Sequence, residues 1–365
     1  MQLIYLSPVP WASFAQRPHK FVDWFHDRTN GSVLWVDPYP TRFPLLSDFH
    51  RFMGKAVQRE VFAPAWLTVI KPSALPIEPL LGSGNVNSFL WRRLLQELTT
   101  IAASSETLLV IGKPSILALI TVDRLKECRS IYDVMDDFPA FYSGLSRFAM
   151  RQRERSLVRR VSVVLASATV LKQRWSTFRN EVGLVRNGLD LGILPPLRLR
   201  SHNNSQKVLG YVGTIATWFD WEWVIALAKA RPQDMVRLIG PVFSTIPAVL
   251  PQNIEMLPPC DHQTALLAIQ EFDVGLIPFK KTTLTESVDP IKYYEYRALG
   301  LPVLSTDFGE MTLRGSIDGT YLSYSVEDVG ELVALALQYR VSSEVIHKFR
   351  ELNSWKSRFD NADII

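Results

Sequence analysis

Apolar runs of strand length alternate with longer stretches of mixed polarity along most of the chain. Several of these runs end in Pro, Gly or Asp, residues that commonly terminate strands. The alternation is typical of parallel sheets covered by helices. The runs are residues 3–8, 32–38, 65–72, 107–114, 129–137, 162–168, 207–215, 235–242, 253–259, 272–279, 301–306 and 319–325. We therefore predict an α/β protein with two Rossmann-like, doubly wound sheets in series.

The pattern breaks between residues 187 and 206, where Asn-Gly, Pro-Pro and a polar SHNNSQ cluster occur. A chain of 365 residues also suits two domains better than a single core. We predict a first domain over residues 1–190, a linker over 191–206 and a second domain over 207–341. Residues 342–365 are expected to form one or two terminal helices.

The composition indicates a compact globular protein, because apolar residues make up 47% of the chain and charged residues 21%. Cys128 and Cys260 lie far apart and predict neither a disulfide framework nor a zinc site, which favours a reducing compartment. The start lacks a basic leader followed by a long apolar region, and no run approaches the ~18 apolar residues of a membrane span. We expect a cytoplasmic protein without a membrane-spanning segment.

Positive charge is concentrated in one predicted helix, Arg147–Arg160, in a chain with a net charge of +4 and a pI of about 9.0. Clustered arginines attract anionic headgroups by roughly 1 kcal/mol each, so contact with a membrane surface is one hypothesis. The alternative is a solvated helix face, because Glu154 interrupts the run and Leu157 and Val158 supply an apolar side. Nucleic-acid binding is suggested only by the pI, since no recognition-helix or aromatic-basic motif is present.

The stretch DPIKYYEYRALGLPVLST, residues 289–306, has the best-marked boundaries in the chain. Asp289 is a candidate helix cap, and Pro290 fits the first helical turn. Gly300 and Pro302 end the helix before an apolar strand. We predict one helix followed directly by one buried strand.

Lys292 and Glu295 share a face of this helix, within about one turn of its N-terminus. The free N–H groups and the dipole at that end favour anions. Because lysine suits phosphate and glutamate suits paired ribose hydroxyls, one interpretation is a site for a nucleoside diphosphate. The other is an ordinary solvated Lys–Glu pair on a surface helix. These residues alone leave both interpretations open.

Two aspartates follow the apolar run Ile131–Met135. Ligands of open α/β sheets bind beyond the carboxyl ends of the strands, so we expect Asp136 or Asp137 to project into a cleft. A carboxylate in that place can act as a general base towards an attacking hydroxyl group. Asp137 has an alternative role as the cap of a helix that starts near Pro139, so we favour Asp136 for the chemistry.

Several segments, in the expected order, resemble the nucleotide-sugar glycosyltransferases of the GT-B fold. They are residues 8–25 with the sequence QRPH, 132–138 (YDVMDDF), Asn187-Gly188, 211–223 (YVGTIATWFDWEW), 238–241 (LIGP), 276–281 (LIPFKK) and 289–306. The resemblance implies two Rossmann-like domains that face each other across a cleft. It also implies that the terminal helix, residues 342–365, returns to the first domain, where Trp355 would anchor it.

In such enzymes a helix glutamate binds the ribose, and a lysine and nearby amides bind the diphosphate. The donor-binding residues that the resemblance implies are Gly213, Thr214, Gly240, Pro241, Phe279, Lys280, Lys292 and Glu295. Many retaining members carry a second acidic residue eight positions before the ribose-binding glutamate, where this chain has Ser287 next to Glu286. This departure leaves the retaining or inverting outcome open.

The first domain is implied to bind the acceptor. Arg17 and His19 would lie in a loop after the first strand and face the cleft, where Arg17 offers a planar fork for a phosphate or carboxylate. The alternative for Arg17 is to hold its loop by bonding backbone carbonyls. In an inverting enzyme Asp136 would be the base, and in a retaining one it would position hydroxyls instead.

The resemblance thus implies a hexosyltransferase that moves a sugar from a nucleoside-diphosphate donor to a saccharide acceptor in bacterial cell-surface or exopolysaccharide biosynthesis. A lipid-linked acceptor at the inner face of the cytoplasmic membrane would make use of Arg147–Arg160. We expect neither a metal nor a separate cofactor. The alternatives are a sugar-nucleotide epimerase of the same fold, a noncatalytic nucleotide or nucleic-acid binding protein, and a dehydrogenase, for which no G-x-G-x-x-G motif is found.

Overall fold

The computed structural model describes residues 1–41, 62–80, 82–197 and 206–365, which form two compact units. Unit 1 consists of Met1–Val185 and Ala362–Ile365, and unit 2 of Arg186–Asn361. Unit 2 begins before the predicted linker because Asn187 and Leu189 already hydrogen-bond to residues of unit 2. Within the predicted linker, Leu191–Ile193 form a short 3-10 helix, η2, and residues 198–205 lie outside the described part.

Unit 1, as far as it is described, has a seven-stranded parallel sheet with the order β3-β2-β1-β4-β5-β6-β7. The strands are β1 (Gln2–Leu6), β2 (Val33–Val36), β3 (Leu67–Ile70), β4 (Thr107–Ile111), β5 (Arg129–Val134), β6 (Val163–Ala166) and β7 (Val182–Leu184). The strands predicted for the first half are confirmed, with shorter bounds. The sequence analysis missed β7, because a three-residue edge strand with a central glycine has no clear apolar pattern.

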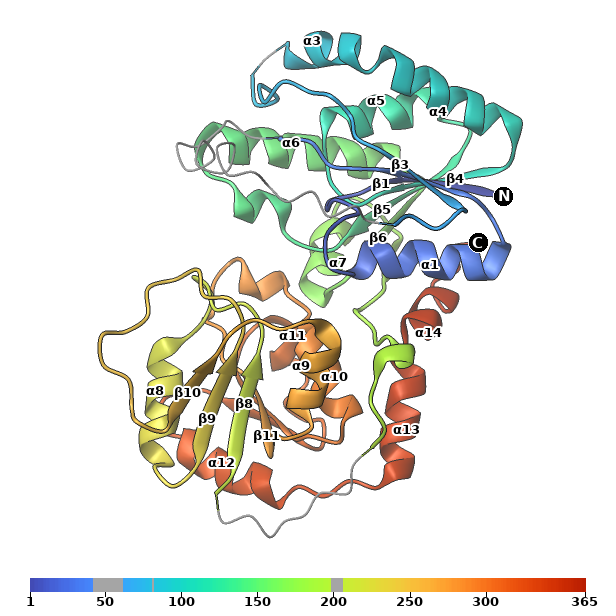
Figure 1. Ribbon diagram of the computed structural model, residues 1–365. Coiled ribbons are helices and arrows are strands. Elements are labelled where there is room, and N and C mark those ends of the chain that lie inside the picture. Colours follow the sequence, from blue (N-terminus) through green and yellow to red (C-terminus); the bar gives the residue numbers. More distant parts are fainter. Residues whose placement is uncertain (42–61, 81, 198–205) are drawn as a thin grey trace. The chain divides into compact units, whose positions relative to one another are not determined.

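Helices cover both faces of this sheet (Figure 1). The largest apolar cluster of unit 1 joins one sheet face to α4, α5 and α6, with Trp91 fully buried at the start of α4. On the other face α1 buries Phe21 and Phe25, and the Phe21 ring lies 5.6 Å from the Tyr5 ring. The helices are α1 (Arg17–Thr29), α3 (Ser83–Leu90), α4 (Arg92–Ser104), α5 (Ile116–Arg124), η1 (Phe138–Phe141), α6 (Gly144–Arg160) and α7 (Thr169–Ser176).

Unit 2 repeats the arrangement with a six-stranded parallel sheet, β10-β9-β8-β11-β12-β13. The strands are β8 (Val208–Val212), β9 (Met235–Ile239), β10 (Ile254–Leu257), β11 (Val274–Ile277), β12 (Val303–Thr306) and β13 (Thr320–Ser323). Each of them was predicted. Two parallel sheets covered by helices confirm the predicted α/β class with two Rossmann-like units.

The helices of unit 2 also form two layers. Those that pack in one apolar cluster with the sheet are α9 (His262–Ile269), α10 (Ile291–Ala298) and α11 (Gly309–Thr312), and those in the opposite cluster are α8 (Trp221–Ala230) and α12 (Val329–Gln338). In both sheets the strand order reverses next to the first strand of the unit, between β1 and β4 and between β8 and β11. Ligands of doubly wound folds bind at the carboxyl edge of such switch points.

The terminal residues, expected to form a helix that returns to the first domain, are divided between the two units. Both terminal helices, α13 (Ser343–Leu352) and α14 (Trp355–Asp360), belong to unit 2. The Trp355 backbone pairs with Leu189, and its ring lies against Gly188, where an added Cβ would come within 3.0 Å of it. Only Ala362–Ile365 join unit 1, where the Asp363 carbonyl accepts a hydrogen bond of 2.6 Å from Arg129.

Asp289 does not cap α10, contrary to the prediction. The helix begins at Ile291 after Pro290, which occupies the N-cap position without a side-chain hydrogen bond. The Asp289 side chain turns instead into the protein, where it is buried. Proline at the N-cap shifts the helix start one residue later and frees the carboxylate for other partners.

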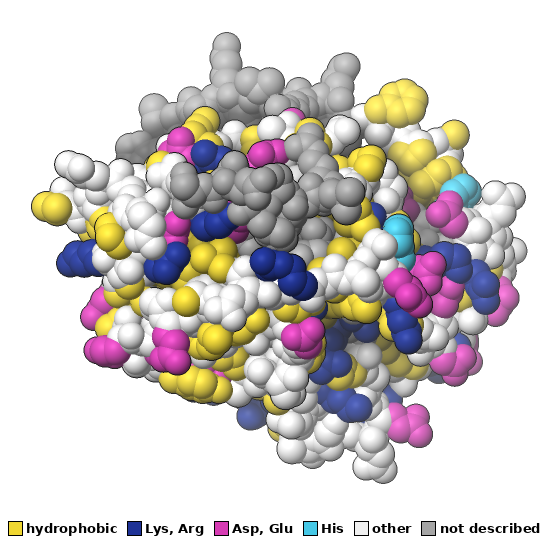
Figure 2. Space-filling view, turned by 90° about the horizontal axis from the view of Figure 1, so that it is seen from below, with side chains coloured by type: hydrophobic (Ala, Val, Ile, Leu, Met, Phe, Trp, Pro, Cys, Tyr) yellow, Lys and Arg dark blue, Asp and Glu magenta, His cyan; other side chains and the backbone are white. Residues whose placement is uncertain are grey.

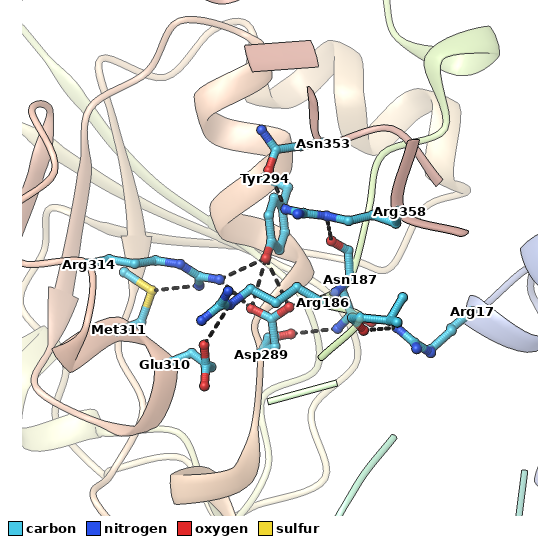
Figure 3. A network of polar contacts seen from close by, with 11 residues as sticks. Arg17, Arg186, Asn187, Asp289, Tyr294, Glu310, Met311, Arg314, Asn353 and Arg358 are labelled. Carbon is cyan, nitrogen blue, oxygen red and sulfur yellow. Dashed lines mark hydrogen bonds and ion pairs between the residues drawn. The ribbon is translucent and has the colours of Figure 1, made fainter. Parts of the chain in front are cut away.

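The Asp289 carboxylate is the centre of the polar network drawn in Figure 3. One oxygen accepts from the Asn187 backbone N–H at 2.7 Å, and the other pairs with Arg314 at 2.5 Å. The Tyr294 hydroxyl donates to the same carboxylate at 3.0 Å, and the Asn187 side-chain amide donates to the Asp289 carbonyl at 2.7 Å. The network therefore fixes the first residues of unit 2 to the start of α10.

Removal of this carboxylate is expected to destabilise unit 2 strongly. The Asp289→Ala variant leaves the buried Arg314 charge and the Asn187 amide without their partner, a loss of about 3–5 kcal/mol in the free energy of unfolding. Urea denaturation followed by tryptophan fluorescence measures it. The control is Glu255→Ala, which breaks a half-exposed pair with Arg237 and should cost about 1 kcal/mol or less. Equal losses in the two variants would contradict the central role of Asp289.

Candidate functional site

Glu295 and Lys292 meet on the first two turns of α10, as predicted. The Lys292 ammonium lies 2.7 Å from one oxygen of the Glu295 carboxylate, and the ring of His262, at the start of α9, lies 2.7 Å from the other. The Glu295 side chain is only 4% exposed. The pair is therefore not the ordinary solvated surface pair of the alternative interpretation.

The charge of Glu295 is maintained in spite of its burial. Burial alone raises the pKa of this carboxyl group, but the Lys292 charge and the hydrogen bond from His262 outweigh that effect, so the pKa lies below its usual value. An ionised carboxylate only accepts hydrogen bonds, which suits it to bind hydroxyl groups.

The N-terminus of α10 has unsatisfied donors. No side chain caps it, and the N–H groups of Ile291 and Lys292 have no hydrogen-bond partner among the described residues. In a helix these groups carry the positive end of the dipole. The start of α10 can therefore accept an anionic group from a ligand.

The corresponding helix of unit 1 differs in this respect. Its α5 follows β4, as α10 follows β11, but its first N–H groups are bonded by side chains of the protein. The Ile116 amide donates to the buried carboxylate of Glu78 at 3.0 Å, and the Ala118 amide donates to the Ser115 hydroxyl at 3.1 Å. Unit 1 thus places its own carboxylate where unit 2 leaves the position open.

Gly213, Thr214, Gly240 and Pro241 lie beyond the ends of β8 and β9. Gly240 has a φ of +145°, and a Cβ at this position would come within 2.1 Å of the Gly213 carbonyl oxygen. The Gly213 amide donates to the Ile239 carbonyl at 2.9 Å, which holds the two loops together. The close approach of the two backbones explains the glycine at 240, whereas a Cβ at Gly213 would come within 2.7 Å of the Tyr211 hydroxyl oxygen. Donor binding by these four residues stays a prediction.

Phe279 and Lys280 follow β11. The Phe279 ring packs against Phe308 at 5.3 Å, and its amide donates to the Thr306 hydroxyl at 3.1 Å. The Lys280 side chain is exposed, while its amide donates to the Trp218 carbonyl at 2.7 Å. Donor binding by these two residues stays a prediction.

Ser287, which stands where many retaining glycosyltransferases have an acidic residue, does not lie at the surface. Ser287 is buried and its hydroxyl donates to the Leu284 carbonyl at 3.1 Å, whereas Glu286 is exposed. Both lie in a short 3-10 helix, η3 (Thr285–Ser287). A different acid, Glu310, is buried beyond β12 and pairs with Arg186 at 2.9 Å.

Arg17 and His19 lie in the first turn of α1 rather than in the predicted loop, because Pro18 and the cap at Gln16 start the helix there. Arg17 forms two hydrogen bonds, of 2.7 and 2.8 Å, with the buried Asp133 carboxylate and donates a third, of 2.7 Å, to the Val185 carbonyl. This matches the structural alternative for Arg17. The guanidinium group of Arg17 is therefore already hydrogen-bonded to residues of unit 1.

His19 is equally enclosed. Its ring lies between Trp11 and Trp35, with centroid distances of 5.0 and 4.9 Å. Burial lowers the pKa of the ring, which favours the neutral form. Acceptor or phosphate binding by Arg17 and His19 remains a prediction that the observed packing does not favour.

Asp136 and Asp137 follow β5 and differ in their partners. Asp137 is buried and pairs with Arg174 at 2.9 Å, and its side chain makes no capping hydrogen bond to η1. Asp136 is partly exposed, and burial raises its pKa to about 7, which Arg17 lowers and Asp137 raises in smaller measure. Asp136 is therefore the more accessible of the two carboxylates.

The sequence analysis missed the contact of His262 with Glu295, and it missed the burial of Glu154. His262 carries no local signal, because only the fold brings α9 next to α10. Glu154, noted only as an interruption of a basic run, is buried and accepts a hydrogen bond of 2.8 Å from Tyr132. Burial raises the pKa of Glu154 to about 8.

The described residues contain no group of three or more His, Cys, Asp or Glu side chains that could hold a metal ion. Within the same ranges, none of the helices combines the length and the apolar character that crossing a membrane requires.

Comparisons with known proteins extend this description. No family model matches the sequence. TuaH of Bacillus subtilis (strain 168), described as a putative teichuronic acid biosynthesis glycosyltransferase, is 25% identical to this chain over 75% of this chain and 72% of that protein.

Solved structures match almost the whole chain. Sucrose-phosphate synthase from Thermosynechococcus elongatus has a TM-score of 0.68 at 11% identity, over 99% of this chain and 97% of that one. HepE from Anabaena, in complex with UDP and glucose, has a TM-score of 0.62 at 13% identity, over 100% and 96% of the two chains. The comparisons confirm that the chain has the GT-B fold and that it resembles the glycosyltransferases built on that fold.

Proposed function

We propose that this protein is a glycosyltransferase that moves a sugar from a nucleoside-diphosphate donor to a saccharide acceptor. The observation that carries the proposal is the start of α10. The first two turns of this helix hold two backbone N–H groups that no described residue bonds, together with the Lys292 ammonium and the ionised, buried Glu295 carboxylate. A diphosphate matches the positive groups, and the ribose hydroxyls match the carboxylate.

The contrast between the two units supports a donor site in unit 2. The Glu78 carboxylate already occupies the helix start in unit 1, whereas α10 leaves its amides open. The positive groups at α10 also suit the leaving diphosphate, whose charge grows as the glycosidic bond breaks. The proposed scheme needs no metal, because Lys292 and the amides supply the positive charge, and no cofactor besides the nucleotide sugar.

The names of the similar proteins suggest the base of the donor and the pathway in which the acceptor is used. The HepE structures are described with UDP, glucose and UDP-glucose, and TuaH is described in teichuronic acid biosynthesis. By analogy we propose a UDP-sugar donor and a lipid-linked saccharide acceptor in the assembly of bacterial cell-surface or exopolysaccharide.

Asp136 is the proposed base for the acceptor hydroxyl. It lies beyond the carboxyl end of β5, it is partly exposed, and its pKa of about 7 matches the pH at which a general base works well. Asp137, paired with Arg174, is proposed to hold this segment in place rather than to exchange protons.

We also propose that the protein works at the inner face of the cytoplasmic membrane, with α6 on the lipid. Glu154 does not interrupt the exposed basic face, because it points into unit 1 towards Tyr132. The exposed arginines of α6 are Arg147, Arg151, Arg155, Arg159 and Arg160, and large apolar side chains near its start, Phe141, Leu145 and Phe148, are 54%, 55% and 61% exposed.

Arginines and exposed apolar side chains on one helix fit an anionic lipid surface. Figure 2 shows one face of the molecule on which Lys and Arg side chains are interspersed with Asp, Glu and apolar ones.

Donor binding tests the site in unit 2. Wild-type protein should gain thermal stability with UDP-sugars, since a ligand at about 100 times its dissociation constant adds roughly 2.7 kcal/mol. The Glu295→Ala variant should lose most of this gain, because the ribose hydroxyls lose their acceptor. A variant that retained full donor affinity, measured by calorimetric titration, would exclude the ribose assignment.

Measurements of the turnover rate test the proposed role of Asp136 as the base. The base must be deprotonated, so kcat/KM should fall as the pH drops below about 7. Asp136→Asn should bind the donor normally and lose turnover by about 10²–10⁴-fold, and it should no longer show this pH limb. Asp137→Asn is the comparison, which should keep the limb. An unchanged rate in Asp136→Asn would remove the residue from the chemistry.

Vesicle binding tests α6. Replacing Arg151 and Arg155 by Glu should weaken binding to phosphatidylglycerol vesicles by about 30-fold, at roughly 1 kcal/mol per arginine. Co-sedimentation measures the partition. The matched control replaces Arg340 and Lys348, exposed in unit 2, by Glu and should bind almost as wild type. Equal losses in the two double variants would mean that net charge alone, and not this helix, governs binding.

A further inference from the structure

Both oxygens of the Glu295 carboxylate are held by cation-capable side chains from two different helices. Lys292 belongs to the same helix, three residues earlier, and lies 2.7 Å from Oε2. His262 belongs to α9, in a different βα segment, and its Nε2 lies 2.7 Å from Oε1. The carboxylate therefore has one partner along its own helix and one across the helix pair.

The two partners contact the carboxylate from different sides. Lys292, three residues before Glu295, lies on the same face of their shared helix. The His262 ring contacts the other oxygen from the neighbouring helix, so the two contacts together favour one orientation of the carboxylate plane. The side chain of Glu295 is 4% exposed and that of His262 is 45% exposed, so the ring forms the solvent side of the pair.

The first turn of α9 is fixed independently of Glu295. The Asp261 carboxylate caps the helix by accepting hydrogen bonds from the Thr264 amide at 2.8 Å and from the Thr264 hydroxyl at 2.9 Å. His262 is thus carried by a capped helix start and not by a loose loop. A side chain mounted in this way can impose its position on a partner.

We infer that His262 is a positioning residue for the ribose of the donor, acting by holding the Glu295 carboxylate in its binding orientation. The inference rests on the proposed function, because it takes Glu295 to be the ribose acceptor. A carboxylate offers about four lone-pair sites, and His262 and Lys292 use two of them. The two that remain match the paired hydroxyls of a ribose.

The experiment compares His262→Gln and His262→Leu with wild type. Glutamine can still donate a hydrogen bond to Glu295, whereas leucine of similar size cannot. His347→Gln is the matched control, because His347 is exposed on α13. Calorimetric titration with UDP, GDP and ADP first identifies the nucleotide that wild type binds, and each variant is then titrated with it and with its 2′-deoxy analogue.

The expected result is a loss of ribose selectivity. His262→Leu should bind the ribonucleotide about tenfold more weakly, which corresponds to about 1.4 kcal/mol, and should discriminate less between it and the deoxy analogue. His262→Gln should recover much of both, and His347→Gln should match wild type. In turnover assays the KM for the donor should rise in His262→Leu while kcat changes little.

Other outcomes overturn the inference in distinguishable ways. Unchanged or tighter binding in His262→Leu would show that the ring is neutral for, or competes with, the ribose. Equal weakening for both nucleotides, without recovery in His262→Gln, would indicate general damage to the fold instead of positioning. If wild type bound none of the nucleotides, the proposed function would fail, and this inference with it.

Discussion

The buried carboxylate of Asp289 cannot exist without partners, because an uncompensated charge in the protein interior costs several kcal/mol. Its partners come from three places: Asn187 at the entrance to unit 2, Tyr294 on α10 and Arg314 beyond α11. Satisfying this one group therefore fixes the position of the chain that enters unit 2 relative to the helix that carries Lys292 and Glu295. On the other side of the entrance, the Val185 carbonyl is held within unit 1 by Arg17.

The two units share a strand order but use the start of their equivalent helices differently. In unit 1 the amides of α5 are consumed by Glu78 and Ser115, which makes that position part of the internal hydrogen bonding. In unit 2 proline occupies the cap position of α10, and no side chain takes the place of an anion. The same fold thus yields a closed position in unit 1 and an open one, as far as the residues are described, in unit 2, because different residues stand at the two helix starts.

Local patterns in the sequence were sufficient to predict every described strand except β7, because the others lie in short apolar runs. They also placed Lys292 and Glu295 together, since residues three apart on a helix share a face. The partners that lie far apart in sequence could not be predicted. His262 is 33 residues from Glu295 and Asp133 is 116 residues from Arg17, and only the folded chain brings each pair together.

The prediction that Asp289 caps α10 was wrong for a related reason. An aspartate before a helix is usually a cap, and nothing in the local sequence shows that Arg314 competes for it. The edge strand β7 was missed because its three residues, with glycine at the centre, lack a repeating pattern. Sequence patterns predict elements with strong periodicity. They miss short strands without a pattern and side-chain roles that depend on distant charges.

The distribution of thiols has a practical consequence. Cys260 is exposed two residues before His262, whereas Cys128 is partly covered and burial raises the pKa of its thiol. Thiol-directed reagents should therefore modify this chain first at Cys260, beside α9. A fluorophore attached there would lie near the residues proposed to bind the nucleotide and would report binding without any engineered attachment point.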